Sequence, residues 1–301
     1  MNFNGLLLVN KQAGPTSHDI VAGVRKILRT KEVGHCGTLD PIASGLLVLT
    51  CGEATKLSQY ITDGNKKYWV RMQLGVETDS YDVTGNVVNE TDVTESEEAI
   101  RDSILSMQGT FDLEVPIYSA IKKNGKKLYE YARDGKEVEL PKKVMKFWDL
   151  KISYFENPII EFEVSCSKGS YIRSLVSQIG KKLGCGATMT ALERVSSEPF
   201  DLDKAISLHD LHGISSLVNT EAYVKIEEAL PNVKVFKVSG FEEQLLKNGQ
   251  IGATLRTELI RGFDPKNDEF VQIQSSTSGR LLAIVGLDQQ KGFYLKRVFK
   301  Y

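Results

Sequence analysis

The stretch whose residue types best suit chemistry is the glycine-rich segment 34–45, which holds the imidazole of His35, the thiol of Cys36 and the carboxylate of Asp40. Its three glycines permit tight turns and let the backbone approach a ligand closely. The apolar run 46–49 that follows is typical of a buried strand. A reactive group on a loop held by a core strand suits a catalytic site. The same residues alone also suit an ordinary turn, so the rest of the chain must decide.

Length and composition describe an ordinary globular protein. The chain has 301 residues, of which 41% are hydrophobic and 26% charged, enough for one large domain and a smaller one. No apolar run approaches the roughly 20 residues that cross a bilayer, and the N-terminus lacks a signal-peptide pattern. We therefore expect a cytoplasmic protein without a membrane segment. A net charge of −1 argues against a protein that coats nucleic acid through overall charge.

The spacing of cysteine and histidine residues gives no metal-ligand pattern. His209 and His212 are three residues apart but have no cysteine near them, so surface positions are the simpler interpretation. We expect no metal, no cofactor, and the reduced thiols of a cytoplasmic protein. The four cysteines are Cys36, Cys51, Cys166 and Cys185.

Hydrophobic patterning predicts a mixed α+β domain followed by a smaller β-rich unit. A helix capped by Thr16 or Ser17 has its apolar residues on one face, and alternation over 66–72 predicts a strand with one buried face. Short β-type runs near the C-terminus indicate a small all-β module, so we divide the chain into 1–230 and 231–301. Further expected elements are strands at 5–9, 144–155 and 159–166, and helices at 54–61, 95–107 and one that the segment 168–173 opens.

One cation lies where a helix disfavours it. Arg173 falls in the first turn of the helix that the segment 168–173 is predicted to open. The helix dipole disfavours a positive charge at that end. A carboxylate partner for Arg173 is therefore expected.

The segment 121–146 differs in charge from the rest of the chain. It contains nine basic and four acidic residues, a local net charge of +5. A solvated, lysine-rich surface is one interpretation. Tyr118, Tyr129 and Tyr131 in and beside the segment favour another, in which it contacts the phosphates and bases of a nucleic acid.

Several motifs in order along the chain closely resemble the TruB family of bacterial tRNA pseudouridine synthases, which act on uridine 55 in the TΨC arm. The resemblance covers the first domain, and the C-terminal module resembles the family's PUA domain, mainly over 235–252. Gln12 and Glu193 stand where the family usually has proline and a basic residue. The matching motifs are Lys11, Gly34–Pro41, Gly52–Lys56, Lys67-Tyr68, Lys126–Ala132 and Lys168–Arg173.

The resemblance implies a fold and a reaction. The fold would be α+β, with a mixed-sheet pseudouridine synthase domain and a small all-β PUA-like domain. The reaction breaks the C1′–N1 bond of uridine and rejoins the base through C5, without a cofactor or metal. Asp40 would be the nucleophile or proton acceptor, which requires its ionised form, and Arg173 would pair with it and favour that form. Tyr68 would stack on the target base and assist proton transfer.

The resemblance also implies how RNA is bound. Tyr171 and Leu192 would line the uracil pocket, and His35 would help to hold the flipped-out nucleotide. Lys11 and Lys56 would contact the substrate, and the insertion 121–146 would grip the T arm of tRNA. The enzyme would act as a monomer, with no obligate protein or guide-RNA partner, and could have an accessory role in tRNA folding.

Three other interpretations compete with this one. An RNA-binding module without catalysis explains the basic segment but not a carboxylate on a glycine-rich loop. A thiol enzyme would use Cys36 or Cys51 with His35, although adjacent side chains on an extended loop usually point apart. A guide-RNA-dependent relative would need partners and extensions that a compact 301-residue chain does not suggest.

Overall fold

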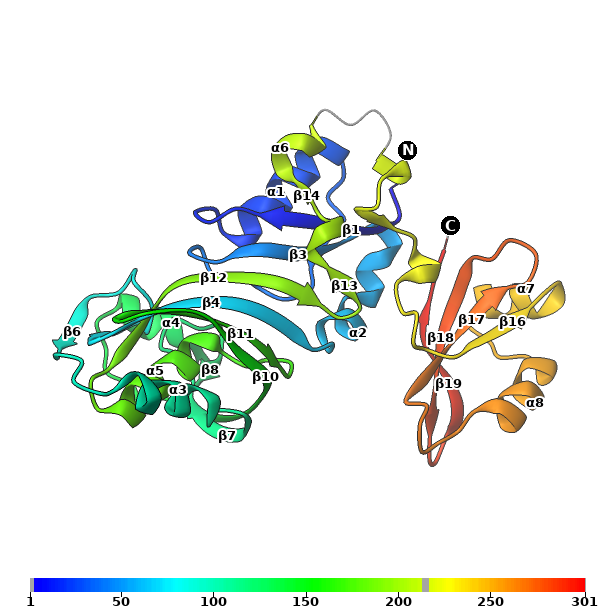
Figure 1. Ribbon diagram of the computed structural model, residues 1–301. Coiled ribbons are helices and arrows are strands. Elements are labelled where there is room, and N and C mark those ends of the chain that lie inside the picture. Colours follow the sequence, from blue (N-terminus) through cyan, green and yellow to red (C-terminus); the bar gives the residue numbers. More distant parts are fainter. Residues whose placement is uncertain (1–2, 213–216, 301) are drawn as a thin grey trace.

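The computed structural model describes residues 3–212 and 217–300, which form two units, each built on a β-sheet. The larger sheet has 11 strands and the smaller has four, and the two units lie side by side (Figure 1). Helices pack against both sheets, so the predicted α+β class is confirmed. No described helix is both long and apolar enough to cross a lipid bilayer.

The larger sheet is mixed. Its main path runs β14-β1-β3-β12-β4-β11-β10-β7, while β2, β13 and β15 pair with β3, β12 and β1. The pairs β1–β14 and β3–β12 are parallel, and the other pairs are antiparallel. The strands are β14 (Ile206–Ser207), β1 (Gly5–Lys11), β3 (Ser44–Cys51), β12 (Ala187–Ser197), β4 (Lys66–Leu74), β11 (Ile159–Cys166), β10 (Lys142–Glu156), β7 (Gly109–Glu114), β2 (Val33–His35), β13 (Phe200–Asp201) and β15 (Tyr223–Val224).

The central strands are formed by the apolar patterns seen in the sequence. Strands β1 and β3 are buried along almost their whole length, as expected for near-continuous apolar runs covered on both faces. In β4 burial alternates, with Tyr68, Val70 and Met72 inward and Arg71 exposed. The buried strand at 46–49 and the amphipathic strand at 66–72 are both confirmed.

Helices α1, α3 and α5 pack against the larger sheet. Helix α1 (Ser17–Leu28) begins at Thr16, whose hydroxyl accepts from the Asp19 backbone N–H at 3.1 Å while the Asp19 carboxylate accepts from the Thr16 N–H at 2.8 Å. Helices α5 (Ile172–Leu183) and α3 (Glu97–Leu105) lie together against the half of the sheet that contains β7 and β10 (Figure 1). The remaining elements of this unit are η1 (Gly52–Leu57), α2 (Ser58–Thr62), β5 (Val76–Thr78), β6 (Val87–Glu90), β8 (Lys122–Lys123), β9 (Lys126–Lys127), α4 (Leu128–Arg133), η2 (Leu202–Lys204), α6 (Leu208–Leu211), η3 (Leu217–Asn219) and η4 (Ile226–Glu228).

The C-terminal unit contains the expected sheet and also two helices that the all-β prediction lacked. Its first two strands are parallel neighbours, and such a pair needs a crossover connection, which is usually helical. Leu246, Leu255 and Leu259 from these helices are fully buried against the sheet. The elements are β16 (Val235–Val238), α7 (Phe241–Lys247), α8 (Ala253–Gly262), β17 (Phe270–Ser275), β18 (Leu281–Asp288) and β19 (Gly292–Val298).

Gly45 lies where the Asp40 loop enters β3, and it allows β3 and its neighbour β12 to approach closely. It has a φ of +97°, and a Cβ there would lie 2.5 Å from the carbonyl oxygen of Arg194. Gly14 has a φ of +111°, but a Cβ at that position would meet no other atom within 4 Å. Both substitutions strain the backbone, but only the one at Gly45 also creates a clash.

We therefore expect Gly45→Ala to lower the free energy of unfolding by at least about 2 kcal/mol more than Gly14→Ala does. Urea denaturation of both variants measures the difference. Equal losses would mean that β3 and β12 can separate without cost.

Candidate active site

A pocket of about 350 Å³ opens where the larger sheet, the loop before β3 and the start of α5 meet. Its volume lies in the range of small-molecule sites. Asp40 from the loop, Tyr68 from β4, Leu192 from β12, and Tyr171 and Arg173 from the start of α5 all line it. The structure thus gathers five of the residues singled out in the sequence around one cavity.

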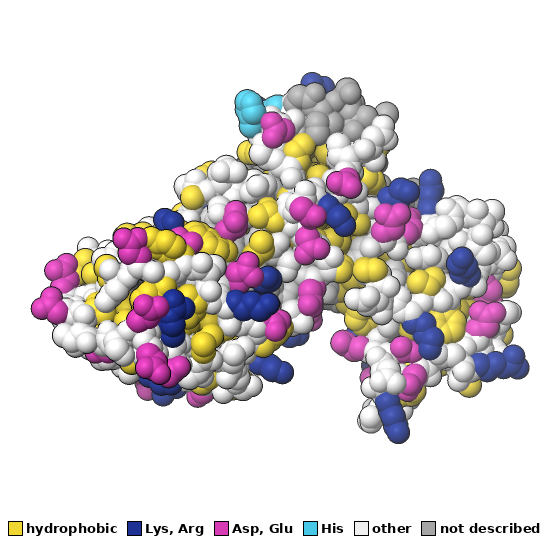
Figure 2. Space-filling view, viewed as in Figure 1, with side chains coloured by type: hydrophobic (Ala, Val, Ile, Leu, Met, Phe, Trp, Pro, Cys, Tyr) yellow, Lys and Arg dark blue, Asp and Glu magenta, His cyan; other side chains and the backbone are white. Residues whose placement is uncertain are grey.

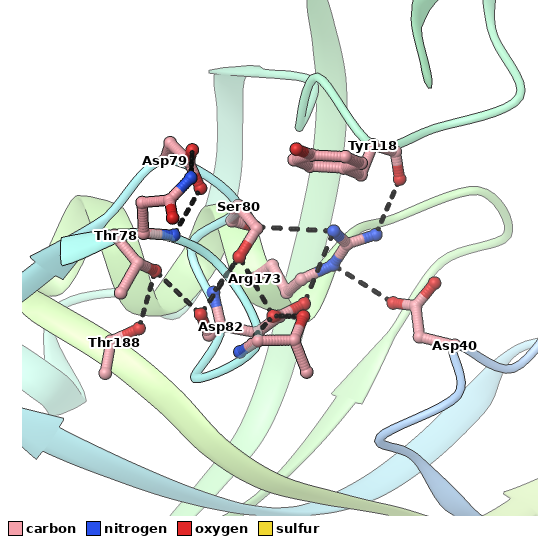
Figure 3. Close-up of polar contacts among 10 residues, drawn as sticks. Asp40, Thr78, Asp79, Ser80, Asp82, Tyr118, Arg173 and Thr188 are labelled. Carbon is pink, nitrogen blue, oxygen red and sulfur yellow. Dashed lines mark hydrogen bonds and ion pairs between the residues drawn. The ribbon is translucent and has the colours of Figure 1, made fainter. Parts of the chain in front are cut away.

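Arg173 is the centre of the polar contacts in this pocket. Its side chain is 4% exposed, and its Nε lies 3.0 Å from Asp40 Oδ2. Its Nη1 lies 3.5 Å from Asp82 Oδ2 and donates to the Ser80 carbonyl at 3.3 Å, while Nη2 donates to the Tyr118 carbonyl at 3.0 Å (Figure 3). All three guanidinium nitrogens are therefore engaged, and Asp40 is the carboxylate partner that a cation at a helix start was expected to have.

Asp82 is the residue at this site that the sequence analysis missed. It is buried, and its Oδ1 accepts from the Ser80 hydroxyl at 2.9 Å and from the Thr84 backbone N–H at 3.0 Å. The sequence of the segment 78–85 indicates a polar turn. The available signal was a carboxylate among serine and threonine donors, a composition that can fix a buried acid in place.

Burial is the largest influence on the ionisation of Asp40, and it raises the pKa of that carboxyl. The neighbouring Arg173 acts in the opposite direction, whereas the negative charge of Asp82 raises the pKa further. Burial also raises the pKa of the hydroxyls of Tyr68 and Tyr171. The pocket thus holds two neutral phenols beside a carboxylate that keeps 33% of its side chain exposed.

Two buried cations, Lys11 and Arg194, hold the Asp40 loop in place. Lys11 Nζ donates to the Ala43 carbonyl at 2.6 Å, and Arg194 donates through Nε to the Leu46 carbonyl at 2.7 Å and through Nη2 to the Gly37 carbonyl at 3.1 Å. Burial lowers the pKa of Lys11, while the charge of Asp40 raises it. Neither cation lines the pocket, so both position the loop in this structure.

His35 and Lys56 also lie outside the pocket lining. His35 is half-buried in β2, where burial, followed by the nearby positive charge of Arg194, lowers the pKa of its imidazole and favours the neutral ring. Lys56 Nζ lies 2.6 Å from Glu53 Oε2 and donates to the Val298 carbonyl at 2.9 Å. In this structure Lys56 joins the large unit to the last strand of the C-terminal unit.

The thiols are unsuited to nucleophilic chemistry. All four cysteines are free and buried. Burial raises the pKa of Cys36 to about 11 and that of Cys51 to about 12, so neither forms a thiolate readily near neutral pH. Burial and the raised pKa values both argue against the thiol-enzyme interpretation. Among residues 3–212 and 217–300, no group of three or more His, Cys, Asp or Glu side chains could hold a metal ion.

Six of the nine basic residues in the segment 121–146 divide into two parts. Lys123, Lys126 and Lys136 form ion pairs with acidic residues of the same segment, Glu139 for the first and Asp134 for the other two. On the face shown in Figure 2, acidic and basic side chains are likewise interspersed. Part of the local positive charge is therefore neutralised within the protein.

The other part lies at the mouth of the pocket. Tyr129 lines the pocket, and the side chains of Lys127 and Arg133 lie 5.3 Å and 5.4 Å from the centroid of its ring. The Lys143 ammonium lies against Gly169, next to the pocket residue Ser170. These three cations therefore lie beside residues that line the Asp40 pocket or adjoin its lining.

Comparison with known proteins identifies the family to which this chain belongs. The model of the TruB family pseudouridylate synthase N-terminal domain matches residues 25–172, and that of the tRNA pseudouridylate synthase B C-terminal domain matches 173–232. The chain belongs to the TruB family of pseudouridylate synthases. It is 49% identical to tRNA pseudouridine synthase B of Bdellovibrio bacteriovorus, over 99% of this chain and 98% of that one. It is 38% identical to the Thermotoga maritima protein of the same name, over 96% and 92%.

Solved structures share the fold of this TruB family member. A chain in the structure of an H/ACA ribonucleoprotein bound to a substrate RNA containing 2′-deoxyuridine superimposes with a TM-score of 0.69 at 23% identity, covering 99% of this chain and 85% of that chain. A chain of an archaeal box H/ACA complex gives 0.67 at 22% identity, covering 99% and 86%. The α+β pseudouridine synthase fold is thereby confirmed.

The raised pKa of Asp40 has a consequence for stability. Because the pKa is higher in the folded than in the unfolded state, the ionised carboxylate lowers the free energy of unfolding at neutral pH, and this loss disappears below about pH 4. We expect Asp40→Asn to abolish turnover but to raise the melting temperature at pH 7 by about 1 to 4 °C. Calorimetry at pH 7 and at pH 4 measures the melting temperatures of the wild type and the variant.

Asp19 provides a control of opposite sign. Hydrogen bonds from Thr16 lower its pKa, so Asp19→Asn should lower the melting temperature at pH 7. A lower melting temperature for Asp40→Asn as well would show that the ion pair with Arg173 outweighs burial.

Proposed function

We propose that this enzyme converts uridine 55 in the T arm of tRNA to pseudouridine. The observation that carries the proposal is the ion pair between Asp40 and Arg173 at the end of a pocket of nucleotide size in a TruB family chain. The named tRNA pseudouridine synthases that match nearly the whole chain support tRNA as the substrate. The position in tRNA rests on the motif resemblance.

Asp40 is the reacting group in this proposal. The reaction exchanges the C1′–N1 bond of uridine for a C1′–C5 bond; C5 loses a proton and N1 gains one, so no redox partner is consumed. Asp40 takes part as nucleophile or proton acceptor in its ionised form, which Arg173 favours. The two neutral phenols in the pocket, of Tyr68 and Tyr171, are placed to donate or relay a proton.

The target base reaches Asp40 by leaving the RNA stack, which costs a few kcal/mol. Tyr68 and Leu192 offer a ring face and an apolar wall for the extruded uracil. The neutral imidazole of His35, on the strand that precedes the Asp40 loop, supports the extruded nucleotide from outside the pocket. In the free protein Lys11 holds the Asp40 loop, and Lys56 contacts the C-terminal unit. A substrate contact by Lys56 would therefore require its ion pair with Glu53 to open.

The rest of the tRNA is held by two basic regions. One is the insertion 121–146, and the other is the PUA-like unit 231–301, which has eleven basic and seven acidic residues in a chain of net charge −1. We assign the catalytic domain to 1–230. The enzyme acts as a cytoplasmic monomer without guide RNA or an obligate protein partner.

Incubation of the purified chain with unmodified tRNA transcript tests the proposal. Transcript labelled with tritium at C5 of uridine should release tritium, and mapping should place the product at position 55. A transcript with cytidine at position 55 and the Asp40→Asn enzyme should both be inactive. Product at another uridine would refute the assigned position, and product only after addition of guide RNA would favour the guide-dependent interpretation.

The cations at the pocket mouth should make most of the phosphate contacts of the insertion. Replacing Lys127, Arg133 and Lys143 together by alanine should flatten the plot of log affinity against log salt by about 2, since each phosphate contact contributes about 0.7–0.9. The matched control replaces Lys123, Lys126 and Lys136, whose ion pairs with Asp134 and Glu139 compete with RNA. Equal changes in the two triple variants would show that these ion pairs open on binding.

A further inference from the structure

Tyr81 has an unusual backbone conformation at a sensitive place. Its φ of 63° is in the left-handed region, which large side chains rarely adopt. Arg29, which has a similar φ, ends helix α1, where this conformation is common. Tyr81 instead lies between two residues that contact Arg173. Strained backbone of this kind often persists where function requires it.

The conformation turns both neighbours of Tyr81 toward one guanidinium. The Ser80 carbonyl and the Asp82 carboxylate lie 3.3 Å and 3.5 Å from the same nitrogen of Arg173 (Figure 3). The Tyr81 carbonyl accepts from the Met189 N–H of β12 at 3.1 Å, which fixes the turn to the sheet. An extended φ at Tyr81 would change the directions of Ser80 and Asp82 relative to each other.

The Tyr81 side chain is held elsewhere, in a polar cavity of about 220 Å³ beside α5. Lys181 Nζ lies 5.8 Å from its ring centroid and 3.1 Å from Glu114 Oε2. The carbonyl of Glu114 also accepts from the Ser174 hydroxyl at 2.5 Å. The ring therefore contacts the helix that carries Arg173 through Lys181.

We propose that Tyr81 is a positioning residue for the reaction: its left-handed backbone sets Ser80 and Asp82 against Arg173, and its ring, anchored by Lys181 and Glu114, holds that backbone in place. The inference rests on the proposed function. The anchor explains how a tyrosine is kept at a position where glycine or asparagine would be less strained. Tyr81 acts through Arg173 on Asp40 and does not touch the substrate.

Three substitutions separate the backbone from the ring. Tyr81→Val opposes the left-handed conformation and should lower kcat at least about tenfold while KM for tRNA changes less than about twofold. Tyr81→Gly permits the conformation without the anchor, so kcat should fall only about threefold, and Tyr81→Phe should stay within about twofold. If Tyr81→Gly lost as much activity as Tyr81→Val, the backbone part of the proposal would be wrong.

Adjacent lysines on α5 provide a matched pair. Lys181→Met removes the anchor and should lower kcat about threefold. Lys182→Met should leave it unchanged, because the Lys182 ammonium contacts Ser106 instead. These variants keep the proposal testable if Tyr81→Val does not fold. Equal activities for the two would refute the anchor.

The pH profile distinguishes positioning from a general loss of stability. The charged or titratable groups around Asp40 are Lys11, Tyr68, Asp82, Tyr171 and Arg173. A displaced guanidinium stabilises the Asp40 carboxylate less, so the acid limb of kcat should move to higher pH in Tyr81→Val.

If Tyr81→Val lowers the melting temperature but leaves the acid limb of kcat at the pH of the wild type, the proposal is refuted. Wild-type enzyme is the reference throughout. If it forms no pseudouridine, the proposed function fails; if wild type and Tyr81→Val turn over equally well, only this inference fails.

Discussion

The buried guanidinium of Arg173 is the interaction on which the site depends. A buried cation is costly unless its N–H groups are paired, and here they engage two carboxylates and two carbonyls. Those partners come from the loop before β3, the turn after β5 and the segment before β8. One side chain on α5 therefore fixes the relative positions of three segments, one of which carries Asp40.

Buried cations also hold the Asp40 loop. Lys11 from β1 and Arg194 from β12 are almost completely buried, and both donate to loop or strand carbonyls. The loop is thus held by backbone contacts on one side and by Arg173 on the other, which leaves the carboxylate pointing into an open pocket. A carboxylate kept charged in this setting lowers stability, as reactive groups commonly do.

Under the proposed function, charge outside the pocket serves RNA recognition. Ion pairs of Lys123 and Lys126 within the insertion neutralise part of its positive charge. Lys127 and Arg133 instead lie against the ring of Tyr129, which lines the pocket. Aromatic rings with adjoining cations suit an unstacked nucleotide and its phosphate. Under the proposed function, binding strength is therefore concentrated near the position where the base leaves its stack.

The sequence by itself determined the elements whose signals are local and the residues carried by motifs. The Thr16 cap, the alternation around Tyr68 and the apolar run of β3 need only neighbours a few positions apart, and the motifs named Asp40 and Arg173. Tertiary structure alone decided that Asp82 shares Arg173, that Lys11 supports the loop, and that Lys56 joins the two units. It also decided the helices of the C-terminal unit, which lie on the crossover between two parallel strands. Each of these depends on partners far away in the chain, and residue spacing carries no record of which distant groups folding will bring together.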